Sequence, residues 1–295
     1  MAKVTLFCMT EKSINVLDNI LPHYSSWVDK VVVSRDKNVQ YDYYEEITKV
    51  CKHFGVPFFD KSDVFTVDSD YCIAIGWRWL IDAKQSKLIV FHDSLLPRYR
   101  GFSPVISALI NGEEKIGATA LYASKDYDRG AILYQESVNI TYPIKIQQAI
   151  DIISSLYAKI AVKIFERILM NEIIPSLEQD ESYATYSLWR DENDYFVDWS
   201  LDARVIRRFI DAVGFPYKYA KTIVGDNCYR ILEAEALEDV VVENRTPGKI
   251  IFKEENNPVV VCGSGLLKIT KMKCDKTGRD PLHEINFRSR FSSYK

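Results

Sequence analysis

The sequence lacks several features that would assign it to a familiar class of protein. Its six cysteines form no C-x-x-C pair, so we expect no structural zinc site. No basic segment followed by a long apolar region stands at the amino terminus. No apolar stretch reaches the roughly 18 residues that span a bilayer. We therefore expect a reduced, cytosolic protein that is neither exported nor embedded in a membrane.

The chain also lacks an excess of positive charge. Its formal net charge is -3 and its pI is about 5.9, so no overall attraction draws it to a phosphate backbone, and nucleic acid is an unlikely partner. No G-x-G-x-x-G follows the first apolar run, so the glycine-rich fingerprint of dinucleotide-binding domains is absent from this sequence. With 295 residues, 47% of them hydrophobic, the chain is long enough for two folded domains.

The first half of the chain alternates between short apolar runs and segments with helical spacing. The expected strands cover residues 4–8, 30–34, 56–59, 72–77 and 88–92, and the expected helices cover residues 11–21, 41–54, 103–111 and 146–172. This alternation predicts an α/β domain with a doubly wound, mainly parallel sheet. Residues 117–124 and 131–140, joined by an acidic turn, predict an antiparallel pair at the edge of that sheet.

The second half of the chain has a different pattern. Periodicity is lost from 175 to 201, a helix is expected at 203–213, and short strands follow at 221–224, 228–234, 248–252, 258–262 and 266–272. Such strands predict a small β-barrel or sandwich. We therefore place the first domain at residues 1–185, a linker at 186–205 and the second domain at 206–295.

Two polar residues mark the expected functional edge of the sheet. His92 ends a buried strand, and Asp128 lies in the acidic turn about 36 positions later. Each alone is equally compatible with a structural role, and Arg98 and Arg100 could be solvated or could pair with Asp93. Ligands bind at the carboxyl edge of open α/β sheets, and a carboxylate there raises the pKa of an imidazole and fixes its tautomer. The two residues therefore predict an acid/base pair.

The motifs around this pair resemble those of the folate-dependent formyltransferases. The run His92-Asp-Ser-Leu-Leu-Pro-Arg-Tyr-Arg-Gly101 matches the family pattern H-x-S-L-L-P-x-x-R-G. The runs Asn111-Gly-Glu113, Gly117-Ala-Thr119 and Asp128-Arg-Gly-Ala-Ile-Leu133 follow in the family's order, and Asp194-Tyr-Phe-Val-Asp-Trp199 is similar to its linker. Whole-chain similarity is greatest to the nucleotide-sugar N-formyltransferases. The resemblance implies a Rossmann-like formyltransferase fold followed by an OB-like barrel.

The resemblance also implies a reaction and a set of site residues. A formyl group passes from N10-formyltetrahydrofolate, the co-substrate, to an amine without a metal. His92 stabilises the oxyanion and Asp128 supports its charge and moves protons. The expected folate contacts are Gly76, Trp77, Arg78, Trp79, Leu95, Lys125 and Asp126. The expected contacts of the second substrate are Met9, Thr10, Arg100, Tyr186, Trp189, Arg190 and Tyr217.

One position departs from the family pattern. Val90 stands where the family has an asparagine that helps to hold the formyl oxygen, and losing one such donor costs on the order of 3 kcal/mol. Asp93, Ser94 and Asn111 are near it in sequence and are candidates to replace that donor. A non-catalytic protein that binds folate or a nucleotide sugar is therefore an alternative.

The acceptor amine is expected on a nucleotide-linked amino sugar for surface polysaccharide or glycan biosynthesis. Transfer RNA, the acceptor of methionyl-tRNA formyltransferase, is the alternative. It would need a basic surface, but residues 206–295 hold only 16 Lys and Arg against 12 Asp and Glu, an excess of 4. Hydrolysis of formyl-tetrahydrofolate is disfavoured because the known hydrolases carry a preceding regulatory domain. A homodimer is compatible with the sequence, which does not decide the oligomeric state.

Overall fold

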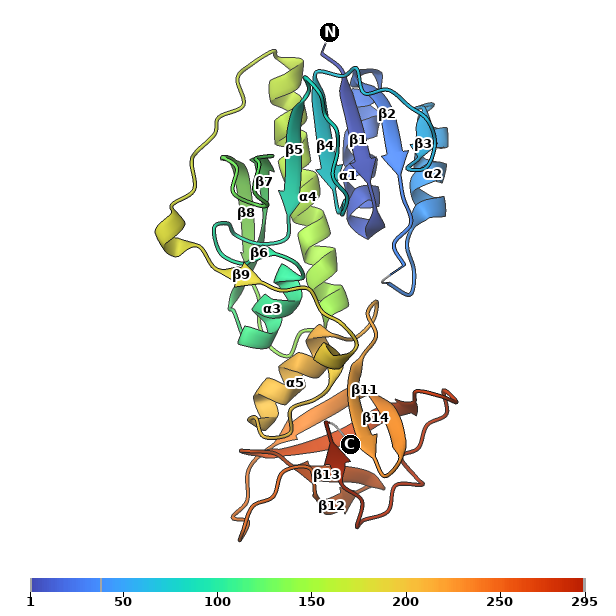
Figure 1. Cartoon of the computed structure of the whole chain (residues 1–295), viewed down its shortest axis with the longest axis vertical. Coiled ribbons are helices and arrows are strands. Elements are labelled where there is room, and N and C mark those ends of the chain that lie inside the picture. The colour runs from blue at the N-terminus through green and yellow to red at the C-terminus, as the bar shows by residue number, and fades with distance from the viewer. Residues whose placement is uncertain (1, 38, 294–295) are drawn as a thin grey trace. The chain divides into compact units, whose positions relative to one another are not determined.

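The chain folds into two compact units (Figure 1). The computed structural model describes residues 2–37 and 39–293. The first unit contains Met1–Val105, Glu114–Ile140 and Gln148–Leu188, and the second contains Ile106–Glu113, Thr141–Gln147 and Trp189–Lys295. The chain enters the second unit for the last time inside segment 186–205, which we predict as the linker. The domain boundaries themselves stay a prediction.

A seven-stranded sheet forms the centre of the first unit. Its strands are β1 (Val4–Cys8), β2 (Val28–Val33), β3 (Phe58–Asp60), β4 (Tyr71–Ile75), β5 (Lys87–His92), β7 (Lys115–Tyr122) and β8 (Ile132–Asn139), in the spatial order β3-β2-β1-β4-β5-β7-β8. The first five are parallel, and β7 and β8 are antiparallel. The predicted mainly parallel sheet with an antiparallel pair at its edge is therefore confirmed.

Helices cover one face of this sheet. They are α1 (Thr10–Tyr24), α2 (Tyr44–His53) and α4 (Ile146–Leu169). Ring contacts join Tyr24 of α1 to Phe165 of α4 at 5.5 Å, and Phe91 of β5 to Tyr157 of α4 at 4.8 Å. Because Phe91 faces α4, the apolar side chains spaced three or four apart in residues 146–172 pack in the core, as their spacing predicts.

The opposite face of the sheet is covered by the segments on either side of β4, residues 61–70 and 76–86. Phe7, Val32 and Cys72 form its buried core, against which Phe65 and Leu88 pack. Alternate residues of a strand share a face, so on β5 the residues Leu88, Val90 and His92 point to this side. The strand order reverses between β1 and β4, which is where open α/β sheets bind ligands.

A segment without regular periodicity crosses the carboxyl edge after α4. We call residues 177–187 the strap. It contains a short 3-10 turn, Glu181–Tyr183, and strand β9 (Tyr186–Ser187), which pairs in parallel with β6 (Arg100–Gly101). The backbones of Leu177 and Ile132 also exchange hydrogen bonds of 2.8 Å. The sequence pattern did not reveal either of these two-residue strands, because so short a run carries no period.

The second unit contains an antiparallel sheet. Its strands are β10 (Ala220–Val224), β11 (Asn227–Leu237), β12 (Ile250–Glu254), β13 (Asn257–Val261), β14 (Leu266–Cys274) and β15 (Phe291–Ser292), in the order β12-β13-β14-β11-β10-β15. Phe291 N donates to Gly248 O at 2.8 Å, and Lys249 pairs with Arg290, so the two outer strands meet and the sheet curls. An OB-like topology stays a prediction.

Two further α-helices follow in the described part of the chain. They are α3 (Pro104–Asn111), most of which belongs to the second unit, and α5 (Ala203–Ala212). Asp202 caps α5 by accepting a hydrogen bond from Arg204 N at 2.8 Å, and Ile206 and Ile210 are buried. This agrees with the expected helix at 203–213. Within the described parts of the chain, no helix is both long enough and apolar enough to cross a membrane.

Candidate active site

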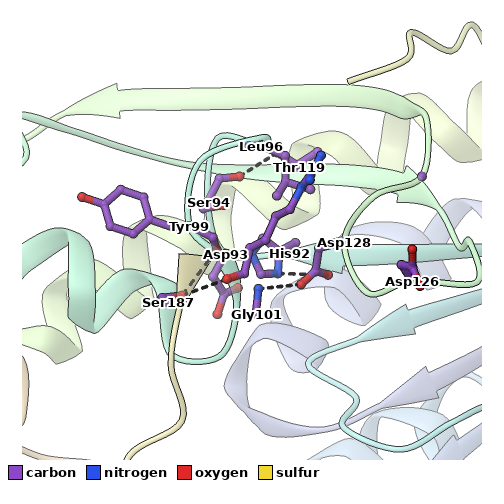
Figure 2. A network of polar contacts seen from close by, with 12 residues as sticks. His92, Asp93, Ser94, Leu96, Tyr99, Gly101, Thr119, Asp126, Asp128 and Ser187 are labelled. Atoms are coloured by element: carbon purple, nitrogen blue, oxygen red, sulfur yellow. Dashed lines mark hydrogen bonds and ion pairs between the residues drawn. The ribbon is translucent and has the colours of Figure 1, made fainter. Parts of the chain in front are cut away.

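His92 lies at the carboxyl end of β5 and is 7% exposed. Its Nε2 atom lies 2.8 Å from the carbonyl oxygen of Tyr99, and its Nδ1 atom lies 3.5 Å from Oδ1 of Asp128 (Figure 2). A residue that ends a strand and a residue 36 positions later thus meet at one edge of the sheet. The structure places the two predicted catalytic side chains in contact, although it does not test their chemistry.

The proton arrangement of this pair follows from its partners. A carbonyl oxygen can only accept a hydrogen bond, so Nε2 of His92 carries a proton and donates it to Tyr99. Nδ1 faces a carboxylate, and the attraction between them is greatest when Nδ1 is protonated as well. The pair can therefore hold a proton between an acid and a base, as a proton transfer between two substrate nitrogens requires.

Asp128 is held by its backbone as well as by its side chain. Its φ angle is +58°, in the left-handed region that is uncommon for residues other than glycine. Its Oδ2 atom accepts a hydrogen bond of 2.8 Å from Gly101 N, and its carbonyl oxygen accepts one of 2.8 Å from Gln179 Nε2. The carboxylate therefore links the turn between β7 and β8 to the loop that follows β5.

The Leu-Leu-Pro loop is fixed by hydrogen bonds to its own backbone. Ser94 Oγ donates to Arg98 O at 2.6 Å, and Thr119 Oγ1 donates to Ser94 O at 2.6 Å. Leu96 N in turn donates to Thr119 Oγ1 at 3.2 Å (Figure 2). Thr119 belongs to β7, so the loop is attached to the sheet and presents the carbonyl of Tyr99 to His92.

Asp93 is the centre of a second charged cluster beside His92. Its carboxylate pairs with Lys12 of α1 and accepts a hydrogen bond from the hydroxyl of Tyr157 in α4. Burial alone would raise the pKa of Asp93, but the Lys12 ammonium and the Tyr157 hydroxyl outweigh it and lower that pKa. Burial, with Asp93 adding to it, raises the pKa of Tyr157 well above its ordinary value. Asp93 is therefore a charged, partnered group.

Val90 lies in apolar surroundings at the position of the family asparagine. Its partners in register are Ala74 on β4 and Leu121 on β7, so neither neighbouring strand supplies a side-chain donor there. Two of the three residues considered as substitutes are engaged elsewhere: Asp93 binds Lys12 and Tyr157, and Ser94 donates to Arg98. The third, Asn111, ends α3.

The four residues after β4 lie beside the carboxyl ends of β1 and β2. A Cβ atom on Gly76, whose φ is +62°, would lie 2.8 Å from Met9 O, so only glycine lets β4 approach β1 here. Trp77 packs edge-on against Phe7 at 5.2 Å. Arg78 NH2 lies 2.7 Å from Asp36 Oδ2. The loop thus forms a wall at the point where the strand order reverses.

Aromatic and cationic groups are available on this wall. Trp79 is 37% exposed, and the Lys61 ammonium lies 3.8 Å from the centre of its ring. Two buried polar atoms, Trp77 Nε1 and Thr10 Oγ1, have no hydrogen-bond partner among the described residues. An unsatisfied buried group costs about 1–3 kcal/mol. A ligand that brings acceptors and an aromatic ring to this wall would suit it.

The remaining predicted folate contacts lie around the Asp128 turn. Leu95 packs so closely against Gly117 that a Cβ atom on that glycine would lie 2.5 Å from it. Lys125 and Asp126 are exposed. In Figure 2 Asp126 lies apart from His92, and no hydrogen bond among the described residues joins its side chain to the network around His92. Lys125 and Asp126 can therefore reach a ligand only from the solvent side.

Arg100 differs from the expectation for a substrate contact. It is only 1% exposed, its NH1 and NH2 atoms bind the Glu181 carboxylate at 2.8 and 2.7 Å, and its NH2 also donates to Gln179 Oε1 at 2.7 Å. Through these contacts the Arg100 guanidinium holds Glu181 and Gln179 of the strap. Tyr186 is 57% exposed and its hydroxyl accepts from Arg129 NH2 at 2.8 Å, so its ring remains open to a ligand.

The other expected substrate contacts are divided between the two units. Met9 is fully buried, and Thr10, whose φ is +66°, begins α1. Trp189, Arg190 and Tyr217 belong to the second unit. There Trp189 is 62% exposed, and Arg190 is half-buried, with a pKa lowered by that burial.

Several residues of the site gave no signal in the sequence. Gln179 contacts the Asp128 turn, Lys12 and Tyr157 bind Asp93, and Lys61 covers Trp79. Each is far in sequence from its partner, and no motif or spacing connects the pairs. In the described part of the chain, no group of three or more His, Cys, Asp or Glu residues could hold a metal ion.

Comparison with known proteins agrees with this arrangement. A family model described as formyl transferase matches residues 67–162, and one described as the C-terminal domain of formyl transferase matches residues 190–284. The methionyl-tRNA formyltransferase of Citrifermentans bemidjiense is 28% identical over 202 residues, which are 68% of this chain and 62% of that protein. This chain therefore spans less than two thirds of that relative.

Solved structures share the fold across nearly the whole chain. The sugar 3N-formyl transferase WlaRD, crystallised in the presence of dTDP and 5-N-formyl-THF, has a TM-score of 0.67 at 17% identity, with 91% of this chain and 97% of that chain covered. The N-formyltransferase of Helicobacter canadensis, in complex with folinic acid and dTDP-3-aminofucose, has a TM-score of 0.67 at 15% identity, with coverage of 92% and 99%. With formyl transferase domains matched in both halves, the chain belongs to the formyltransferase family.

Proposed function

We propose that this protein transfers the formyl group of N10-formyltetrahydrofolate to the amine of a nucleotide-linked amino sugar. The observation that carries the proposal is the contact between His92 and Asp128 at the carboxyl edge of the sheet. One nitrogen of this buried imidazole faces a carboxylate, and the other carries a proton that it donates in a hydrogen bond. Such a group is suited to acyl transfer from one substrate nitrogen to another.

The proposed roles follow from the positions of the atoms around His92 and Asp128. The bound folate supplies the formyl group, whose carbon forms a bond to the amine and breaks its bond to N10 while one proton passes from the amine to that nitrogen. The Nε2–H group of His92 exchanges its hydrogen bond to the Tyr99 carbonyl for one to the formyl oxygen, where negative charge develops. Asp128 stabilises the imidazolium through Nδ1 and assists the proton transfer.

The folate site is proposed along the wall formed by Gly76–Trp79. Trp79 offers a partly open ring on which a pterin could stack, and the Trp77 Nε1 donor lacks a partner among the described side chains. Arg78 is 41% exposed beyond its pair with Asp36, and Lys61 lies above Trp79, so two cations lie beside this wall. The residues present therefore fit a folate.

The proposal of a sugar acceptor is supported by the extent of the chain and by the surroundings of the pair. This chain covers 97% and 99% of two sugar N-formyltransferase structures, one of them with dTDP-3-aminofucose bound. Exposed aromatic rings flank the catalytic pair: Tyr127 is 72% exposed, Phe102 is 58% exposed and Tyr186 is 57% exposed. Such rings can hold the base of a nucleotide or the apolar face of a sugar.

The alternative acceptor is transfer RNA, because the curated relatives are methionyl-tRNA formyltransferases. The second unit gives it little support. Strand β14 carries a cluster of lysines, but Lys268 lies opposite Glu235 and 3.4 Å from Glu254, and Lys271 lies opposite Glu233. These acids balance two lysines of the strand, and the third, Lys273, lies opposite Arg230, whose charge is paired with Glu192 and Asp275. A phosphate backbone requires an unbalanced positive surface.

A direct assay separates these functions. Purified protein is incubated with N10-formyltetrahydrofolate and either a panel of dTDP-linked and UDP-linked 3-amino and 4-amino sugars or methionyl-tRNA, and products are measured by mass spectrometry. We expect a formylated nucleotide sugar. Product from the tRNA arm alone would overturn the sugar proposal. Saturable binding of folate and nucleotide sugar without any product would instead support a non-catalytic binding protein, for which Val90 is the physical reason.

A further inference from the structure

The strap, residues 177–187, is hydrogen-bonded to the loop after β5 and to the turn that carries Asp128. These two segments hold the His92–Asp128 pair. On one side Tyr99 N donates to Thr185 Oγ1 at 2.8 Å and Arg100 N donates to Thr185 O at 2.9 Å, which fixes the loop whose Tyr99 carbonyl accepts from His92. On the other side Gln179 reaches the turn that carries Asp128. The strap therefore determines how the two halves of the pair meet.

The side-chain amide of Gln179 makes the contact to the Asp128 turn. Its Nε2 atom donates to the carbonyl oxygen of Asp128 at 2.8 Å and to that of Gly130 at 2.9 Å. Both protons of one amide group are thereby used on two carbonyls that flank Arg129. Because Asp128 has a φ of +58°, its backbone conformation costs on the order of 1–3 kcal/mol and persists only where the surrounding structure holds it. Gln179 supplies that restraint.

The direction of the Gln179 amide is decided by Arg100. Gln179 Oε1 accepts from Arg100 NH2 at 2.7 Å and from Arg100 Nε at 3.2 Å. Rotating the amide by half a turn would set its oxygen against two carbonyl oxygens and its NH2 group against a guanidinium. Arg100 is itself held by Glu181 on the same strap. The four residues Glu181, Arg100, Gln179 and Asp128 thus form one chain of charge-assisted and amide hydrogen bonds.

We propose that Gln179 is a positioning residue of the formyl transfer, which sets the Asp128 carboxylate against His92 through the backbone of the turn. This inference rests on the proposed function. It predicts that losing the amide donors misplaces Asp128 while leaving folate and acceptor binding intact. Small displacements of a reacting group are sufficient to reduce turnover by on the order of 10²-fold. The effect of Gln179 should therefore appear in kcat and should depend on Asp128.

The kinetic test uses two substitutions of Gln179 in the full chain. Gln179→Met removes the amide, and Gln179→Glu keeps an acceptor for Arg100 but loses both donors. We expect kcat to fall 10- to 100-fold in each, with KM for both substrates within 3-fold of the original. In an Asp128→Asn background, Gln179→Met should cause no further loss, because the group that it positions is gone. Equal losses in both backgrounds would overturn the proposal.

A second readout does not depend on turnover and separates this inference from the proposed function. The chain has four histidines, so the ring signals of His92 can be assigned by NMR at one fixed pH. The charged groups beside His92 are Asp128 and Asp93, the latter paired with Lys12 and bonded to Tyr157. Asp128→Asn should change the nitrogen chemical shift of His92 Nδ1, because that atom loses its carboxylate partner.

Gln179→Met should move the Nδ1 chemical shift of His92 in the same direction by a part of that amount. The matched control is Gln85→Met, the same chemical change at an exposed position away from the site, which should leave that chemical shift unchanged. An unaltered Nδ1 chemical shift in folded Gln179→Met protein would refute the positioning role. Failure to find any acceptor would count against the proposed function alone, since the NMR result is obtained without substrate.

Discussion

The ion pair of Lys12 and Asp93 gives the most stringent stability prediction. Their side chains are 13% and 19% exposed, and Asp93 also accepts from the Tyr157 hydroxyl. Lys12→Met keeps most of the side-chain volume but leaves the carboxylate without its cation. Breaking a fully buried pair costs about 3–5 kcal/mol, and exposed pairs are worth at most about 1 kcal/mol. With one hydrogen bond retained, we expect a loss of about 2–3 kcal/mol at pH 7.

The cost has a ceiling, because the stranded carboxyl group can take up a proton. About three pH units separate pH 7 from the ordinary Asp pKa, and each is equivalent to about 1.36 kcal/mol, so burying the unpaired carboxylate cannot cost more than about 4 kcal/mol relative to its neutral form. The pKa of Asp93 is lowered in the folded protein despite its burial, so the ion pair stabilises fully above the unfolded value near 3.8 and is lost on further acidification. In Lys12→Met, burial is opposed only by the Tyr157 hydroxyl and by His92, so that pKa should rise. The difference between the two proteins should therefore shrink as the pH falls from 7 to 4.5.

The measurement is urea denaturation followed by circular dichroism at pH 7 and pH 4.5. The control is Lys12→Met combined with Asp93→Asn, which removes both charges and should recover more than half of the loss. Three results would refute the reasoning: a loss below about 0.5 kcal/mol at pH 7, a loss that does not change with pH, or a double variant no more stable than Lys12→Met alone.

Three further predictions concern the catalytic pair, the missing asparagine and the buried guanidinium. His92→Asn and Asp128→Asn should each reduce kcat by roughly 10²- to 10⁴-fold while circular dichroism shows a folded protein; near-normal rates in both would contradict the assigned roles. Val90→Asn adds an amide on the same face of β5 as His92 and should raise kcat by on the order of tenfold, since one oxyanion donor is worth up to about 3–4 kcal/mol; an unchanged rate would mean that the oxyanion already has its donors. Arg100→Met should lower the free energy of unfolding by about 2 kcal/mol, because it removes buried hydrogen bonds to a carboxylate and an amide. Glu181→Gln should cost less, as its side chain is 57% exposed; equal losses in urea denaturation would argue against this view of the strap.

The position of Asp93 shows how far sequence motifs reach. The motif placed this residue directly after His92 and marked it as a nearby polar group. Its partners come from α1 and α4, 81 residues before it and 64 residues after it. No local pattern encodes such a pairing, because each partner has an unremarkable helical position. Packing of the two helices on the same face of the sheet brings all three together.

Arg100 shows the opposite relation between motif and structure. It belongs to a highly specific pattern, and its charge suggests contact with an anionic substrate. The fold instead buries it under the strap, where Glu181 and Gln179 occupy its donors. The strap lacks periodicity because it is neither helix nor extended sheet, so its path across the carboxyl edge could not be predicted. For the same reason the role of Gln179 was not visible.

The sequence alone determined the alternation of strands and helices in the first unit, the antiparallel edge formed by β7 and β8, the strand-rich second unit and the place of His92 at a strand end. Those features depend on local spacing and apolar periodicity, which are written in consecutive residues. Only the tertiary structure decided that Nδ1 of His92 faces Asp128, that Val90 has no polar neighbour in register and that the strap closes over Arg100. Those features depend on contacts between residues far apart in sequence, which form when the chain packs.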